Sequence, residues 1–188
     1  MIVKGIFYKI IKINVTVFTV ALFFGCQSNF KDIQKINYTE FMPSGEADSI
    51  NLKYTDSGKI KSILLSNKLL DYGTVAYPFS EFPKGINLTI FDANNQRSYI
   101  VADYAISYKK TKIIDLRGRV KMTSHDGKYL ETDQLYYDQS LEWFYTDKPF
   151  TFTAPGEGVT TGIGIDFSKD FRKITFKQVK ALIDQVPQ

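Results

Sequence analysis

Residues 98–123 contain two strand-like runs joined by a basic turn, and no other stretch constrains the fold as much. In the second run, residues 112–123, charged side chains take one parity and apolar side chains take the other, at Ile114, Leu116, Val120 and Met122. A period of two is typical of a β-strand with one buried face and one solvated face. The charged parity, Asp115 to Lys121, is therefore expected to face water. Gly118 lies on the apolar parity, where a missing side chain leaves room for a close neighbour.

This order of turn, strand, break and strand recurs along the chain. A shift of thirty residues places Asp103 on Asp133, and a backward shift of thirty-six places Asp103 on Asn67. Repeats of this length in a β-rich sequence indicate stacked units whose apolar faces close only against their neighbours. Chance offsets among evenly spaced strands are the alternative explanation.

The first 25 residues have the composition of an export signal. Three lysines and no acids accompany an apolar run, residues 13–24, which Gly25-Cys26 follows. This order is typical of a signal peptide, and the segment LFFGC resembles a bacterial lipobox. We predict that the mature chain begins at Cys26 and is acylated there. An uncleaved anchor helix is the alternative, although the run is shorter than the roughly twenty residues that a spanning helix needs.

Loss of the three signal lysines reduces the net charge at pH 7 from +4 to +1. No basic patch remains that is typical of nucleic-acid binding. We predict a signal peptide over residues 1–25, a tether over residues 26–48 that ends in a Pro-Ser-Gly break, and one folded domain over residues 49–188.

The folded part consists of strand-like runs at short intervals, with no convincing helix. Separate strands are predicted near residues 129–132, 141–145 and 149–153, and residues 173–183 predict the last strand. Four glycines between residues 156 and 164 predict an irregular segment. An all-β sandwich, jelly roll or open curved roll is favoured, with fifteen Phe and twelve Tyr to fill a wide interior.

Four segments, in this order, resemble LptC, the periplasmic component of the lipopolysaccharide transport bridge. They are YTDSGKIKSILLSNKLLDY, the stretch from GINLTIF to RGRVKM, DGKYLETDQLYYD and DKPFTF. The part VADYA…LRGRV, residues 101–120, is similar to the A-D-x-A…L-x-G-x-V pattern of the wider OstA-like group. The resemblance covers about residues 49–183. A lipidated N-terminus departs from the many family members that keep an uncleaved helix.

The resemblance implies a twisted antiparallel β-jelly roll that is open along one side. Such a domain is expected to accept lipopolysaccharide from an inner-membrane ABC transporter and to pass it to an OstA-like or LptA-like periplasmic bridge protein. The N-terminal lipid is expected to anchor it to a membrane, most simply the inner membrane, in the periplasm of a Gram-negative bacterium. Each buried acyl methylene is worth roughly 0.8 kcal/mol, so a lipid with several chains needs this shielding. A structural or adhesive envelope lipoprotein that carries no lipid is the alternative.

The predicted lipid contacts are apolar side chains that share the inward parity of their strands: Leu64, Leu88, Ile90, Leu116, Val120, Phe150 and Phe152. An ordinary core uses the same residue types, so both interpretations stay open. The last strand is expected to dock the next bridge domain along its free edge, with the side chains Ile174, Phe176, Val179 and Ala181. The alternative is that Val186-Pro187 covers this strand or that it simply completes the core. The first edge, near residues 50–54, is expected to meet the transporter.

We expect no catalysis, no metal and no cofactor. His125 is the only histidine of the chain and lies in a Ser-His-Asp-Gly turn. Asp103, Asp133 and Asp166 have the residue type that glycoside hydrolysis uses. Their repeat-related spacing instead predicts equivalent strand ends, where a carboxylate accepts backbone hydrogen bonds.

Overall fold

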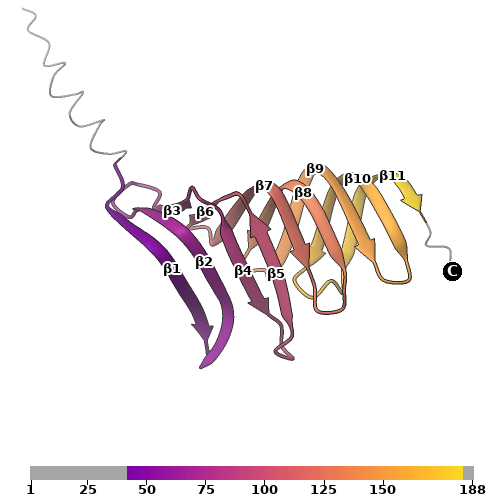
Figure 1. Cartoon of the computed structure of the whole chain (residues 1–188), viewed down its shortest axis with the longest axis horizontal. Coiled ribbons are helices and arrows are strands. Elements are labelled where there is room, and N and C mark those ends of the chain that lie inside the picture. Colours follow the sequence, from indigo (N-terminus) through magenta and orange to yellow (C-terminus); the bar gives the residue numbers. More distant parts are fainter. Residues whose placement is uncertain (1–41, 184–188) are drawn as a thin grey trace, which may run out of the picture. The chain divides into compact units, whose positions relative to one another are not determined.

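The computed structural model describes residues 42–183, which form one antiparallel sheet of eleven strands (Figure 1). The strands are β1 (Gly45–Asp56), β2 (Lys59–Tyr72), β3 (Phe79–Phe82), β4 (Ile86–Phe91), β5 (Arg97–Ala102), β6 (Tyr104–Tyr108), β7 (Ile113–Thr123), β8 (Tyr129–Asp138), β9 (Trp143–Ala154), β10 (Gly158–Ser168) and β11 (Ile174–Ile183). The described residues contain no helix. The predicted all-β class is confirmed.

Long strands bend and so contribute to two facing walls. The first part of β2 pairs with β4 and its last part with β3. In the same way, the last part of β7 pairs with β5 and its first part with β6. One wall therefore contains β4 and β5, the other contains β3 and β6, and the bent strands join them along one side. This arrangement is the predicted β-jelly roll.

The line of bends, here called the ridge, coincides with interruptions in the ladders. The pairing of β7 with β8 shifts between Arg117 and Val120, and that of β9 with β10 between Ile163 and Ile165. Gly118 and Gly164 lie within these interruptions at φ angles of +69° and +78°. These left-handed angles are accessible to glycine at little cost, so the two glycines let their strands turn from one wall to the other.

The hairpin turns lie along two rims at the far ends of the walls from the ridge. The turns 57–58, 92–96, 124–128 and 155–157 follow the lower edge of Figure 1. The other rim consists of the connections 73–78, 109–112, 139–142 and 169–173. Backbone N–H···O bonds of 3.0 Å link its neighbouring loops, from Lys109 to Pro78, from Gln139 to Lys112 and from Lys169 to Glu142. The open side of the roll therefore lies between the two rims.

The core fills the space between the walls. Leu116, Leu135, Phe144 and Phe167 are fully buried there, and the cluster extends from Leu64 in β2 to the residues of β10. Burial of one such side chain stabilises the fold by about 1.5–3 kcal/mol. The cluster therefore contributes much of the free energy that holds the two walls together.

Three boundaries differ from the sequence prediction. The first of the two runs predicted within residues 98–123 is split at Asp103 into β5 and β6, which pair in different walls, because Asp103 N–H donates to Gly118 O across the ridge (3.1 Å). The strands predicted near residues 141–145 and 149–153 are one bent strand, β9. β1 begins at Gly45, so its first residues fall within the range that was predicted as tether.

Residues 158–164 of the glycine-rich segment belong to strand β10 rather than to an irregular stretch, which corrects the prediction there, whereas Gly156 lies in the turn 155–157. A Cβ added to Gly162 would lie 2.2 Å from the carbonyl oxygen of Gln178 in β11. This glycine therefore allows the close approach of β11, and the glycines here serve pairing and bending of the strand.

Two predictions about acidic residues are wrong. Asp115 was expected to face water, yet it is 1% exposed, because Arg117 and Gln134 cover it and donate hydrogen bonds to its carboxylate. Asp103, Asp133 and Asp166 do not lie at equivalent strand ends. Asp103 connects two strands at the ridge, whereas Asp133 and Asp166 lie within β8 and β10, beside the ladder interruptions.

Candidate functional site

The residues predicted as lipid contacts lie together in the interior. All seven belong to the buried apolar cluster and none is more than 8% exposed: Leu64, Leu88, Ile90, Leu116, Val120, Phe150 and Phe152. Leu116 comes from the part of β7 that pairs with β6, and Val120 from beyond the bend, so both walls contribute. The predicted parity is therefore that of the interior face. Contact of these side chains with acyl chains stays a prediction.

One cross-strand row, here called the apolar row, crosses the wall of β4 and β5 from one edge of the sheet to the other. Its members are matched by register through nine strands, and all but one threonine are apolar: Leu52, Leu64, Leu88, Ile100, Met122, Leu130, Phe152, Thr160 and Leu182. Neighbouring strands lie about 4.8 Å apart, so the row extends over roughly 38 Å.

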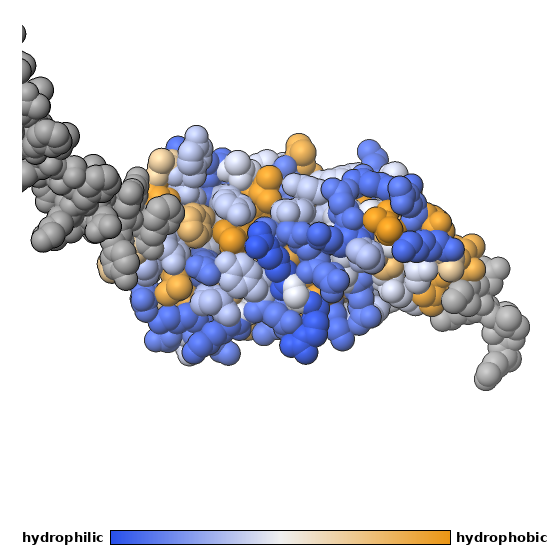
Figure 2. All heavy atoms as spheres, turned by 90° about the horizontal axis from the view of Figure 1, so that it is seen from above, coloured by the Kyte–Doolittle hydropathy of each residue, from blue (hydrophilic) through white to orange (hydrophobic). Residues whose placement is uncertain are grey.

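The two ends of the apolar row reach the surface. Leu52 on β1 is 48% exposed and Leu182 on β11 is 64% exposed, whereas the members between them are buried. Val179, which follows Phe150 and Gly162 in a parallel row, is 53% exposed. Figure 2 shows apolar residues gathered at the β11 end, beside a mostly hydrophilic upper surface. The interior face therefore continues onto both edge strands.

The four predicted docking residues of edge strand β11 differ in their exposure to solvent. Ile174 and Phe176 are half-buried and pack on the core, while Val179 and Ala181 are exposed. A register shift between Thr161 and Gly162 falls between Val179 and Ala181, because Lys180 has no counterpart in β10. Among the described residues, β11 pairs with β10 alone and β1 with β2 alone. Within residues 42–183, β1 and β11 are therefore the edge strands of the sheet, and docking of a partner along them stays a prediction.

Lys177 ties the edge strand to its neighbours. Its Nζ lies 2.8 Å from Asp147 Oδ1 in β9 and 3.3 Å from Asp166 Oδ1 in β10. The hydrogen bond that Lys177 donates to Asp147, together with the nearby charge of Asp166, raises the pKa of Lys177. The ammonium group therefore stays charged and holds β11 near the ridge.

Stacked aromatic rings fill the interior near β11. The ring centroids of Phe144 and Phe167 are 5.1 Å apart, those of Phe150 and Phe176 5.6 Å, and those of Phe152 and Phe171 6.0 Å. Aromatic pairs at such distances add to the stabilisation from buried area alone. The sequence prediction missed Phe144 and Phe167, which lie on stretches whose parity becomes clear only once the bends in β9 and β10 are known.

The two rims carry opposite charge. The loops 73–78, 109–112, 139–142 and 169–173, here called the lysine rim, contain six Lys or Arg residues and two acids, whereas the loops of the other rim contain one lysine and three acids. Lys110 Nζ donates to the carbonyl oxygen of Ala76 (2.7 Å) and lies 4.9 Å from the ring centroid of Tyr77. The lysine rim therefore gives one border of the open side a net positive charge.

The ridge carries a bidentate ion pair next to two grooves. Arg119 donates to both oxygens of Asp103, at 2.8 and 2.9 Å, and these hydrogen bonds lower the pKa of Asp103 and raise that of Arg119. Grooves of about 790 and 420 Å³ share Arg119, and the larger one is lined by Lys84, Asn87 and Asn51 among others. The ridge therefore carries charged and polar side chains, unlike the apolar interior.

Cys26, the predicted lipidation site, lies outside the described residues, as do the signal peptide and most of the predicted tether. Within residues 42–183, no helix has the length and apolar character that crossing a membrane requires. The anchor therefore stays a prediction from the sequence.

Comparison with known proteins gives one family. A family model described as lipopolysaccharide-assembly, LptC-related, matches residues 47–184, which include all eleven strands except the first two residues of β1. A search of curated proteins gives no match.

Proposed function

We propose a lipid-conducting role for this chain, starting from the premise that it belongs to the LptC-related family of lipopolysaccharide assembly. In this proposal the domain accepts lipopolysaccharide from an inner-membrane ABC transporter and passes it to an OstA-like or LptA-like bridge protein. Acyl chains travel along the interior between the walls. The role requires no hydrolysis by this chain, so we propose that it is not an enzyme.

The apolar row is the observation that supports this proposal best. Apolar side chains on the edge strands, where water contacts them, add less to the stability of a core than buried ones do. Here the row continues onto both edge strands, and its terminal side chains Leu52 and Leu182 are about half exposed or more. A neighbouring β-domain that adds a strand to either edge extends both the sheet and its interior face. The acyl chains then stay shielded from one domain to the next.

The lysine rim suits the head of the same lipid. It borders the open side of the roll, where the sugars and phosphates of a lipid with buried acyl chains must emerge. Lys110, Lys112 and Lys173 have no carboxylate within ion-pair distance among residues 42–183. Cations in this position attract phosphate groups through Coulomb forces that salt screens.

We also propose that acylated Cys26 holds the chain at the membrane of the Gram-negative envelope. Intact-mass analysis of the purified protein checks this part independently of lipid transport. The expected mass is that of residues 26–188 plus the acyl groups, and Cys26→Ser is expected to leave an unprocessed precursor. A mass that still includes Met1 contradicts the lipoprotein interpretation and favours an uncleaved anchor.

Site-specific photo-crosslinking tests the path of the lipid. A photoreactive amino acid at Leu116 or Phe150, which are 0% and 4% exposed, is expected to capture lipopolysaccharide in cells with an active transporter. Arg117 is the matched control, because it follows Leu116 directly and its side chain is 48% exposed on the outer face. Equal capture from Arg117 contradicts the interior path. No capture from any position, with a folded protein, favours an envelope lipoprotein that carries no lipid.

A further inference from the structure

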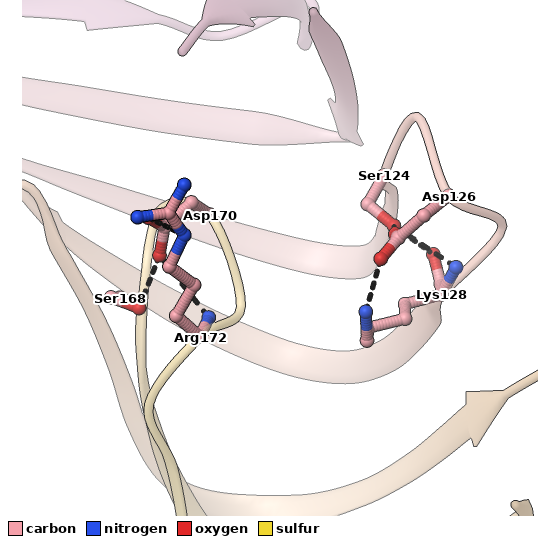
Figure 3. Close-up of polar contacts among 6 residues, drawn as sticks. All are labelled: Ser124, Asp126, Lys128, Ser168, Asp170 and Arg172. Carbon is pink, nitrogen blue, oxygen red and sulfur yellow. Dashed lines mark hydrogen bonds and ion pairs between the residues drawn. The ribbon is translucent and has the colours of Figure 1, made fainter. Parts of the chain in front are cut away.

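Two turns of the chain have the same hydrogen-bond pattern, although they belong to different rims (Figure 3). In each, a serine hydroxyl donates to the carboxylate two residues later, from Ser124 to Asp126 and from Ser168 to Asp170. The residue after each aspartate donates its N–H to the carbonyl of the same serine, at 3.1 and 2.8 Å. The turns are therefore built alike, and their corresponding positions can be compared.

They differ at the position that follows the aspartate. Gly127 stands there in the first turn, with a φ of +82°, and Phe171 stands there in the second, with a φ of +55°. Glycine adopts this left-handed conformation at little cost, whereas a bulky side chain rarely does. The second turn therefore holds an aromatic residue in a strained backbone conformation where its counterpart uses glycine.

The ring of Phe171 is inserted between the walls. The residue is only 5% exposed although it lies in loop 169–173 of the lysine rim. Its ring centroid is 4.7 Å from that of Phe167 and 6.0 Å from that of Phe152. Phe167 lies beyond the bend of β10, in the wall of β3 and β6, and Phe152 belongs to the apolar row of the other wall. The ring thus contacts both walls at the open side.

We propose that Phe171 occupies an acyl-chain subsite and is displaced when lipid enters. This inference rests on the proposed function. In the closed position the ring lies between Phe152 and Phe167. Burial of the ring favours this position, whereas the left-handed backbone of the loop opposes it. Phe171 is therefore held less firmly than a core residue on a strand. A saturated acyl chain in the same space replaces the contacts with Phe152 and Phe167 and releases the strain in the turn.

Fluorine NMR of the wild-type chain observes the displacement directly. The full chain, labelled with 4-fluorophenylalanine and held in phosphatidylcholine nanodiscs, is titrated with hexa-acylated lipopolysaccharide. The resonance of position 171 is assigned by its absence in Phe171→Leu. It is expected to move to the shift of a solvent-exposed ring, while core oligosaccharide released from the same lipopolysaccharide, which lacks acyl chains, leaves it unchanged.

Binding measurements with matched variants give a second readout. Phe171→Gly removes both the ring and the strain. Because apparent affinity falls with the fraction of molecules that are open, this variant is expected to bind lipopolysaccharide about tenfold more tightly if roughly one wild-type molecule in ten is open. Tyr99→Gly is the control, since it removes a 49% exposed ring from the outer face of β5, away from the lysine rim, and is expected to leave affinity unchanged.

The outcomes separate this inference from the proposed function. Lipid binding by the wild type without any movement of the 171 resonance overturns the subsite and leaves the lipid-conducting role intact. A folded Phe171→Gly variant that binds no more tightly than the wild type overturns it as well. Absence of binding by every variant overturns the subsite and the proposed function together. The resonance is measured on the wild type, so a variant that fails to fold does not affect the decision.

Discussion

Leu52 on β1 and Leu182 on β11 are the two ends of a single cross-strand row, although they lie on opposite edges of an eleven-stranded sheet. Between them the row is buried, and only its ends are exposed. The sheet therefore presents the same apolar interior at both places where another β-domain is able to add a strand. A domain built as one segment of a longer trough requires this property.

Replacement of Leu182 by glutamine is expected to reduce lipid handover without unfolding the domain. The side chain is 64% exposed, so the loss of stability is expected to stay within about 0.5 kcal/mol. The polar amide nevertheless interrupts the apolar row at its β11 end. The measurement is crosslinking of lipopolysaccharide to the next bridge protein in proteoliposomes that contain the transporter. Lys180→Gln, an exposed change on the same strand, is the control. Undiminished handover by Leu182→Gln contradicts a continuous apolar path.

Gly118→Ala is expected to destabilise the domain by about 2 kcal/mol. The glycine has a φ of +69°, and an added Cβ would lie 3.1–3.2 Å from the side chain of Asp103, so both the backbone and the ridge contact are strained. Gly156→Ala is the matched control, because its φ is +80° and nothing lies within 4 Å. It is expected to cost about 1 kcal/mol, from the backbone alone. Urea unfolding of both variants gives the difference, and equal costs exclude a role for the contact with Asp103.

Period-two alternation correctly predicted the strands and the inward parity. Leu88 and Ile90 in β4, and Leu116 and Val120 in β7, are buried as their parity requires. This worked even across the ridge, because the bend of β7 keeps even-numbered residues inward on both sides of Gly118. The turn Ser124–Gly127 was also located correctly, since Asp-Gly favours the positive φ angle that Gly127 adopts.

Features that depend on bends and on distant pairing were not predictable. Gly162 and Gly164 suggested an irregular segment, because glycine disfavours strands in general, yet here they accommodate Gln178 and Lys177 of the neighbouring strand. Asp115 has the parity of a solvated residue, and its burial follows from Gln134 on a strand nineteen positions away. The strained insertion of Phe171 likewise depends on Phe152, which only the folded sheet brings near.

Asp115→Ala is expected to destabilise the domain by about 2–3 kcal/mol. Asp115 accepts hydrogen bonds from Arg117 Nε at 2.9 Å and from Gln134 Nε2 at 2.8 Å, so its removal takes the acceptor from both donors and leaves a small void at a buried position. Urea unfolding at neutral pH is the measurement. Asp147→Ala is the control, since its carboxylate is 82% exposed and pairs with Lys177; such exposed pairs contribute up to about 1 kcal/mol. Equal losses from the two variants contradict the role assigned to burial.

Acid is expected to weaken the 124–128 turn within a defined pH range. Burial raises the pKa of Asp126, but hydrogen bonds from Lys128 and Ser124 outweigh it and lower the value from 3.8 to about 2. A carboxyl group whose pKa is lower in the folded than in the unfolded state stabilises the fold above its unfolded value, and this contribution disappears as the pH falls toward the folded value. The loss attributable to Asp126 is therefore expected between about pH 4 and pH 2. Asp126→Asn, which does not titrate, is expected to be less stable than the wild type at neutral pH and to approach it at pH 2, as measured by the free energy of unfolding against pH. A constant difference between the two proteins from pH 7 to pH 2 shows that the charge on Asp126 does not hold the turn.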